Sequence, residues 1–273
     1  MLRARIFTAI AMLCLFLIAV FYLSAIFWMV VLLALTVAGS WEWSRISKFS
    51  VRYSIVYLLL TALLGGELLF VLSRAVENDP QTRVFAGFYI ASLAFWALVV
   101  PYLLRSRHPI KSTTLLALTG WLVLLPTSFA LYQLRAIDPM LLLGLMATVW
   151  ISDTSAYFAG RAFGKHKLAP SISPGKTWEG VAGALTAVFG YALLWSHFAE
   201  SGMQATLLIP LLFVIAVLGI LGDLFESLMK RHADLKDSGS ILPGHGGILD
   251  RIDALTSTLP FAVLSLLFLQ HKL

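Results

Sequence analysis

The sequence predicts an all-α, polytopic integral membrane protein with about nine transmembrane helices. Apolar residues make up 59% of the 273 residues, charged residues make up 12%, and the mean hydropathy is +0.88. A soluble domain is typically about 45–50% apolar and about 25% charged, so this chain has too little polar surface to cover a water-soluble globule. The apolar residues also gather into runs of about 20, the length that crosses a bilayer as a helix.

The predicted spans follow one another with short polar loops between them. The first two come from one apolar run, Ile6 to Ser40, which is too long for one crossing and suits a helical hairpin near Tyr22–Ser24. Counting that run as a single crossing instead leaves eight spans. The nine predicted spans lie near residues 6–22, 24–42, 53–73, 85–104, 113–133, 138–160, 178–198, 206–229 and 252–270.

Basic residues in the predicted loops indicate the orientation of the chain. With nine spans, 16 of the 20 Lys and Arg residues fall on one side of the membrane and 4 on the other. Because basic loops stay in the cytoplasm, we expect a cytoplasmic N-terminus and a C-terminus outside. Arg3 and Arg5 before an apolar run are also typical of a signal peptide. No small-residue cleavage site ends a short core there, which favours an uncleaved first span.

The composition also bears on partners and domains. The net charge is +6, but the basic residues are scattered between apolar runs, so we expect no nucleic-acid partner. The single cysteine, Cys14, excludes an intrachain disulfide and a multi-cysteine metal site. We expect one transmembrane domain over residues 1–273, with membrane helices of residues 1–137 as a scaffold and residues 138–273 carrying the catalytic helices and cytoplasmic loops.

Asp153 and Glu67 are carboxylates inside predicted spans, where a charge is costly and is usually functional. Asp153, in the stretch Ser152–Tyr157, lies within or at the end of the sixth span. We expect it to face an aqueous cavity or a cation; the alternative is that neighbouring hydroxyls satisfy it. Glu67, in the third span, has no partner that the sequence identifies, and its role stays open.

A second polar stretch, residues 171–180, leads into the seventh span. Gly175, Lys176 and Thr177 resemble the tail of a P-loop, but Pro170 occupies the position of the first glycine, and we expect a membrane helix rather than a strand before it. We instead expect Lys176 to contact phosphate, with the hydroxyls of Ser173 and Thr177 donating at a helix N-terminus. A topology anchor with a helix cap explains Lys176 equally, but not Glu179 beside it.

The third stretch places several polar side chains on one face of the eighth predicted span. Asp223, Glu226, Ser227 and Lys230 are spaced i, i+3, i+4 and i+7, so they share one side of a helix. That face carries two carboxylates, a hydroxyl and an ammonium inside an otherwise apolar run. Such a face favours a polar site at the membrane surface.

A glycine-rich loop, residues 244–247, follows and precedes the last span. Three glycines in four positions allow main-chain N–H groups to approach an anion. Asp250 and Asp253 project from one side of the next helical turn, where the helix dipole alone would stabilise them. The dipole does not explain Asp223, so we interpret these carboxylates as an oxygen-ligand Mg²⁺ site that also carries substrate phosphates. His245 either forms a loop hydrogen bond or donates to a phosphate.

From Ser227 to Asp253 the chain resembles, without a gap or mismatch, the signature of the bacterial phosphatidate cytidylyltransferases, or CDP-diacylglycerol synthases. Ser152–Thr154 and Ser173–Gly180 are also similar to that family, whereas the first half is similar only in hydropathy. The residues that carry the signature are Ser227, Lys230, Arg231, Lys236, Asp237, Pro243, His245, Gly246, Gly247, Asp250, Arg251 and Asp253.

The resemblance implies a nucleotidyltransferase of phospholipid biosynthesis that converts CTP and phosphatidate to CDP-diacylglycerol and pyrophosphate. It also implies an all-helical membrane fold, a homodimer in the bilayer and the inner membrane of a bacterium. Among its implied cofactors are Mg²⁺, held by Asp223 and Asp250 with Asp253 as a further ligand, and a monovalent cation such as K⁺.

Such a transfer brings two anionic groups together, so cations and positioning are its main requirements. We expect the glycine loop to offer N–H groups to the triphosphate, and Lys and Arg side chains to neutralise the headgroup and the leaving pyrophosphate. The candidate catalytic residues are Asp223, Lys230, Arg231, Lys236, Asp237, His245, Asp250, Arg251 and Asp253; the candidate substrate- or phosphate-binding residues are Asp153, Ser173, Lys176, Thr177, Glu179, Ser227, Gly246 and Gly247.

Two other functions use some of the same residues. A CTP-dependent lipid or polyprenol kinase would need the same metal and phosphate sites, and only the ungapped signature favours cytidylyl transfer over it. An ion-coupled transporter would explain Glu67, Asp153 and Asp223. Transporters commonly place their sites near the midplane between sequence repeats, whereas here the charged motifs crowd one membrane face.

Overall fold

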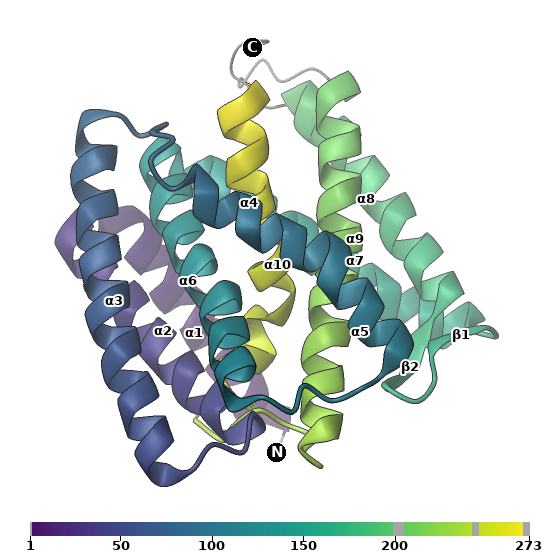
Figure 1. Ribbon diagram of the computed structural model, residues 1–273. Coiled ribbons are helices and arrows are strands. Elements are labelled where there is room, and N and C mark those ends of the chain that lie inside the picture. The colour runs from purple at the N-terminus through teal and green to yellow at the C-terminus, as the bar shows by residue number, and fades with distance from the viewer. Residues whose placement is uncertain (1, 199–204, 242–245, 270–273) are drawn as a thin grey trace.

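The computed structural model describes residues 2–198, 205–241 and 246–269, and its helices form an upright bundle with a small strand pair at one edge (Figure 1). The elements in chain order are α1 (Leu2–Tyr22), α2 (Ala25–Ile46), α3 (Val51–Asn78), α4 (Ala86–Ala94), the π-helical segment η1 (Phe95–Val99), α5 (Val100–Ser106), α6 (Thr113–Ile137), α7 (Pro139–Phe163), β1 (Lys167–Ala169), β2 (Ser173–Thr177), α8 (Trp178–Phe198), α9 (Ala205–His232) and α10 (Leu249–Leu269).

The predicted membrane helices are present. Within the described residues, eight helices are long and apolar enough to cross a membrane, and α1 contributes a shorter apolar segment, Ile10–Tyr22. The prediction of about nine membrane helices in an all-α fold is therefore confirmed, and this is a multi-pass membrane protein. The long N-terminal apolar run is divided as predicted, because α1 ends at Tyr22 and α2 begins at Ala25 after the extended residue Ser24.

Short polar residues mark where later helices begin, because their side chains accept hydrogen bonds from N–H groups that the first helical turn leaves free. The Ser50 hydroxyl accepts from the N–H of Tyr53 at the start of α3, at 3.3 Å. The Asp138 carboxylate accepts from the N–H of Met140 at 2.8 Å, and Pro139 occupies the first position of α7. These caps place the helix starts close to the predicted span boundaries.

One span departs from a regular α-helix. It consists of α4, η1 and α5 and crosses the front of the bundle obliquely (Figure 1). Pro101, just after η1, lacks an N–H and would clash with the carbonyl four residues earlier, so the wider π turn accommodates it. Phe95 and Trp96 on η1 pack edge-on against Phe225 of α9, with ring centroids 5.5 and 5.4 Å away. This span therefore supports the helix that carries the polar face.

A short antiparallel pair of strands joins α7 to α8. Lys167 pairs with Thr177 and Ala169 pairs with Ser173. The expectation that a membrane helix directly precedes the Gly-Lys-Thr sequence is wrong. These three residues end β2, and β1 lies between them and α7. Proline at positions 170 and 174 and Gly175 disfavour a helix here, and the chain turns back within a few residues. Pro170 still excludes the P-loop spacing.

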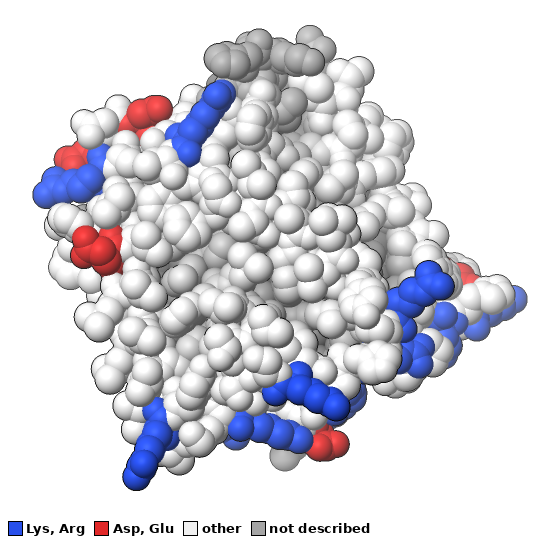
Figure 2. All heavy atoms as spheres, viewed as in Figure 1, with Lys and Arg blue, Asp and Glu red and all other residues white. Residues whose placement is uncertain are grey.

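Helix α10 passes through the middle of the bundle, with α1 to α3 on one side and α7 to α9 on the other (Figure 1). α10 and α6 are the most buried of the membrane-length helices, with 67% of the apolar segment of each buried. Lys and Arg side chains gather along the lower end of the visible face and around the strand pair, and a broad uncharged surface lies above them (Figure 2). The start of α10 therefore lies near this charged end.

Candidate active site

A cavity of about 490 Å³ lies between α7, the strand pair, α9 and α10. All three polar stretches of the second half contribute to its lining, so side chains from distant parts of the chain meet there. The polar side chains that line it are Asp153, Tyr157 and Arg161 from α7, Ser173, Lys176 and Thr177 from β2, Asp223 from α9, and Asp250 and Asp253 from α10. Four carboxylates together with the ammonium of Lys176 and the guanidinium of Arg161 make this a site for cations and for the anions that accompany them.

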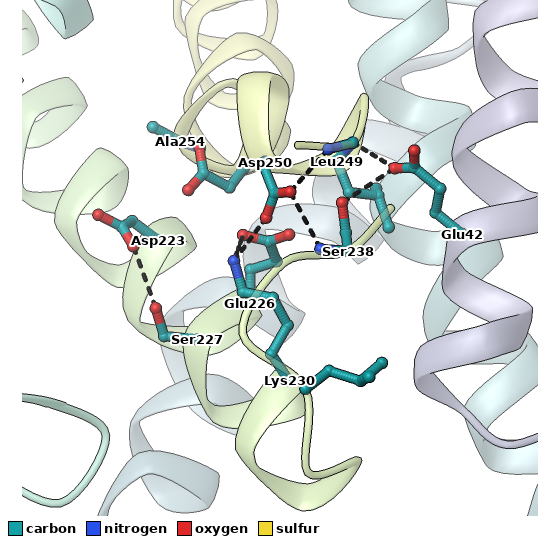
Figure 3. Close-up of polar contacts among 12 residues, drawn as sticks. Glu42, Asp223, Glu226, Ser227, Lys230, Ser238, Leu249, Asp250 and Ala254 are labelled. Atoms are coloured by element: carbon teal, nitrogen blue, oxygen red, sulfur yellow. Dashed lines mark hydrogen bonds and ion pairs between the residues drawn. The ribbon is translucent and has the colours of Figure 1, made fainter. Parts of the chain in front are cut away.

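An ion pair ties the strand pair to α9 at this cavity. Lys176 Nζ lies 2.7 Å from Asp223 Oδ2, and their side chains are 23% and 34% exposed. The other oxygen of Asp223 accepts from the Ser227 hydroxyl at 3.3 Å, one helical turn further along (Figure 3). Because Lys176 is the last residue but one of β2, this contact lies where the strand pair meets the cavity.

Lys230 lies between two carboxylates in the wall of the site. Its Nζ donates to Glu226 Oε2 at 2.8 Å and to Asp250 Oδ1 at 2.7 Å, and the Lys230 side chain is only 12% exposed (Figure 3). Asp250 Oδ2 accepts from the N–H groups of Ser238 and Gly247 at 3.0 and 2.8 Å. Both oxygens of Asp250 are therefore engaged within the chain.

A buried carboxylate from the first half of the chain completes this network. Glu42 of α2 has no exposed surface. Its oxygens accept from the Ser238 hydroxyl at 3.0 Å, from Leu249 N–H at 2.8 Å and from Ile248 N–H at 2.9 Å (Figure 3). Sequence patterns did not single out Glu42, which closes the second predicted span. The same signal that marks Glu67, a carboxylate within an apolar run, would have found it.

The carboxylates of the cavity fit a divalent cation as a donor set, because Mg²⁺ takes oxygen ligands and keeps several waters. Asp153 and Asp253 face the cavity with Asp223, and one oxygen of Asp253 accepts from Ala254 N–H at 2.8 Å. Asp250 also lines the cavity, and its Oδ1, which among the described residues accepts from Lys230 alone, keeps a lone pair for a cation. Across the described ranges, no three Asp, Glu, His or Cys side chains are already grouped around a common metal position.

Comparison with known proteins identifies the family. Residues 3–269 match the model of the cytidylyltransferase family. The chain belongs to that family. A phosphatidate cytidylyltransferase of Haemophilus influenzae is 34% identical over 281 aligned residues, which cover 96% of this chain and 97% of the relative. One of Pseudomonas aeruginosa is 36% identical over 272 residues, covering 97% of each. One of Bacillus subtilis is 47% identical over 113 residues, 41% of this chain.

In this cytidylyltransferase some predicted site residues lie away from the cavity. Glu179 instead pairs with His166, with 2.6 Å between Oε1 and Nδ1. Arg231 is exposed and donates to the carbonyl of Ile172 at 3.3 Å. The exposed residues Lys236, Asp237 and Arg251 are not part of the cavity lining, and Glu67 is exposed on α3 outside it. His245 lies outside the described residues.

Two further predicted residues have structural partners. The Thr177 hydroxyl accepts from the N–H of Gly180 at 3.1 Å and so caps α8. Gly246 has φ +79°, and a Cβ there would meet Asp250 Oδ2. The N–H of Gly247 is bound by Asp250, and the next two N–H groups are bound by Glu42. A carboxylate of the chain therefore already accepts from the Gly247 N–H, and the expectation that the glycine loop offers N–H groups to a triphosphate stays a prediction.

Proposed function

We propose that this cytidylyltransferase transfers the cytidylyl group of CTP to phosphatidate, giving CDP-diacylglycerol and pyrophosphate. The observation that carries the proposal is the cavity of Asp153, Asp223, Asp253 and Lys176, at the charged end of apolar helices. A metal–nucleotide complex brings both the cation and the anion that this set of charges suits. The printed names of the relatives from Haemophilus influenzae and Pseudomonas aeruginosa support the same reaction.

The reaction joins two anions, so the residues must mainly neutralise charge and hold the reactants in line. A phosphate oxygen of phosphatidate forms a bond to the α-phosphorus of CTP, and the bond from that phosphorus to the pyrophosphate oxygen breaks. A phosphate monoester has its second pKa near about 6, so the attacking oxygen is already ionised and no strong general base is required. Mg²⁺ held by Asp223 and Asp253 would neutralise charge on the triphosphate.

The two lysines of the site have different proposed roles. Lys176 is partly exposed to the cavity, and among the described residues its one carboxylate partner is Asp223, so it can exchange Asp223 for a substrate phosphate. Lys230 is held between two carboxylates that are 6% and 7% exposed, so it keeps Asp250 in place rather than reaching the headgroup. Asp250 in turn holds the start of α10, which carries Asp253 into the cavity.

We also propose the bacterial inner membrane as the location, with the N-terminus and active site in the cytoplasm and the C-terminus outside. The distribution of basic loop residues supports this orientation, and CTP is a cytosolic solute. A homodimer and a bound monovalent cation such as K⁺ are supported by the family resemblance alone.

The test uses the purified protein in detergent with mixed phosphatidate micelles, Mg²⁺ and CTP labelled separately at the α- and γ-phosphates. We expect the label of α-labelled CTP to enter the lipid. The label of γ-labelled CTP should leave in pyrophosphate, so that the lipid stays unlabelled. Entry of the γ label would show a lipid kinase instead. No transfer of either label by folded protein would refute both and favour transport. Asp223→Asn is the matched inactive control, because it keeps the shape of the side chain and removes its charge.

A further inference from the structure

Glu42 lies on α2, in the half of the chain that carries none of the family signature, yet its carboxylate contacts the loop between α9 and α10. Its two oxygens accept three hydrogen bonds, from the Ser238 hydroxyl and from the N–H groups of Ile248 and Leu249, at 2.8 to 3.0 Å. Glu42 is fully buried, and Ser238 is 1% exposed. A buried carboxylate is costly unless it is well hydrogen-bonded, so the loop and this side chain depend on each other.

The groups that bind Glu42 are neighbours of the groups that bind Asp250. Ser238 gives its hydroxyl to Glu42 and its N–H to Asp250 Oδ2. Gly247 gives its N–H to Asp250, and the two residues after it give theirs to Glu42. The two carboxylates therefore hold the same two points of the chain, Ser238 within the loop and residues 247–249 where the loop enters α10 (Figure 3).

Two glycines of the loop also make room for the carboxylate of Glu42. A Cβ on Gly239 or on Gly247 would collide with the carboxylate of Glu42, so only glycine allows the loop to approach it. Because Glu42 accepts N–H groups at the start of α10, it acts as the cap of that helix from another part of the chain. The negative charge also complements the helix dipole there.

We propose that Glu42 is a positioning residue of the transfer reaction. It fixes the first turn of α10, and through that turn Asp250 and the ammonium of Lys230, without touching substrate. The inference rests on the proposed function for its kinetic consequence. Displacing catalytic groups by about 1 Å can lower a rate about 100-fold, which sets the size of the expected effect.

The first test is Glu42→Gln, which keeps the shape of the side chain. Whichever way the amide is turned, its NH₂ group faces a main-chain N–H, that of Ile248 or that of Leu249, so one acceptor is lost. We expect kcat for folded, monodisperse protein to fall about 10- to 100-fold. KM for CTP should change less than about 3-fold, since Glu42 does not line the cavity. Glu42→Asp keeps both acceptor oxygens and should recover part of kcat.

The matched control is Glu77→Gln, which makes the same chemical change on a carboxylate near the end of α3 that is 69% exposed and lies outside the cavity. It should leave kcat and KM within about 2-fold of the parent, as surface substitutions usually do. Ser238→Ala is a second variant in case Glu42→Gln does not fold. It removes one donor to Glu42 while keeping the main-chain contact to Asp250, and should lower kcat by a smaller factor.

Hydrogen exchange separates this inference from the proposed function, because it needs no turnover. Peptides containing Ser238 or residues 247–250 should exchange faster in Glu42→Gln than in the parent and the Glu77→Gln control. Unchanged exchange in those peptides would overturn the positioning role even in an inactive preparation. A fall in activity that disappears when rates are expressed per folded molecule would also overturn it. Absence of α-label transfer by the parent protein, with exchange altered as expected, would instead refute the proposed function alone.

Discussion

Replacing Lys230 by methionine should destabilise the protein strongly, because it leaves two carboxylates facing each other without their cation. Lys230 is 12% exposed, and its partners Glu226 and Asp250 are 6% and 7% exposed, so solvent cannot replace the lost ammonium. Removing one partner of a buried ion pair typically costs about 3–5 kcal/mol. Methionine keeps most of the apolar stem, so the loss reports mainly on charge.

The assay is thermal unfolding of Lys230→Met in detergent, followed by tryptophan fluorescence. A cost of about 3–5 kcal/mol corresponds to a fall in Tm on the order of 10 °C for a chain of this size. Adding Glu226→Gln should return part of the loss, because it removes one of the two unpaired charges. Glu226 is the better choice for this rescue, since its Oε1 has no hydrogen-bond partner in the described structure and Asp250 has two main-chain donors.

Lys236→Met serves as the control, because Lys236 is an exposed lysine of the following loop. Its Tm should stay close to that of the parent protein, as expected for a surface change of about 0.5 kcal/mol or less. A Lys230→Met protein with an unchanged Tm would refute the buried ion-pair reasoning. Failure of Glu226→Gln to raise the Tm of the double variant would show that lost packing, not unpaired charge, causes the destabilisation.

Three further substitutions test the site. Asp223→Asn should lower kcat/KM by about 100-fold or more while leaving expression and membrane insertion intact; near-normal turnover would refute its role toward Mg²⁺. Lys176→Ala should weaken substrate use about 10- to 100-fold without changing Tm, measured as kcat/KM for CTP and for phosphatidate; unchanged constants would make it a topology anchor only. Gly247→Ala should cost about 1–3 kcal/mol, seen as a lower Tm, because its Cβ would collide with Ser238 and Glu42.

The membrane helices were predictable because hydropathy is a local property of the chain. The hairpin between α1 and α2 and the long helices that follow agree with the apolar runs. The strand pair before α8 was not predictable in the same way, since β1 and β2 are too short to show a periodic pattern. Their pairing depends on the turn between them and on main-chain hydrogen bonds, which join Lys167 to Thr177 and Ala169 to Ser173.

The candidate site was predictable in part. Asp153, Ser173, Lys176, Thr177, Asp223, Asp250 and Asp253 were chosen from their sequence patterns, and all line one cavity. The expected roles were less accurate, because the sequence does not say which partner each charge meets. The Gly247 N–H donates to Asp250, and Glu179 pairs with His166.

By itself, the sequence determined which segments are long and apolar enough to cross a membrane and which stretches carry the charged chemistry. Both are properties of residues that are neighbours in the sequence, so they do not depend on how the helices pack. Only the tertiary structure decided that Glu42 holds Ser238 and Leu249, 196 and 207 positions away along the chain, and that Lys230 lies between Glu226 and Asp250. The physical reason is that a buried charge takes the partner that helix packing brings to it, and packing joins residues without regard to their distance along the chain.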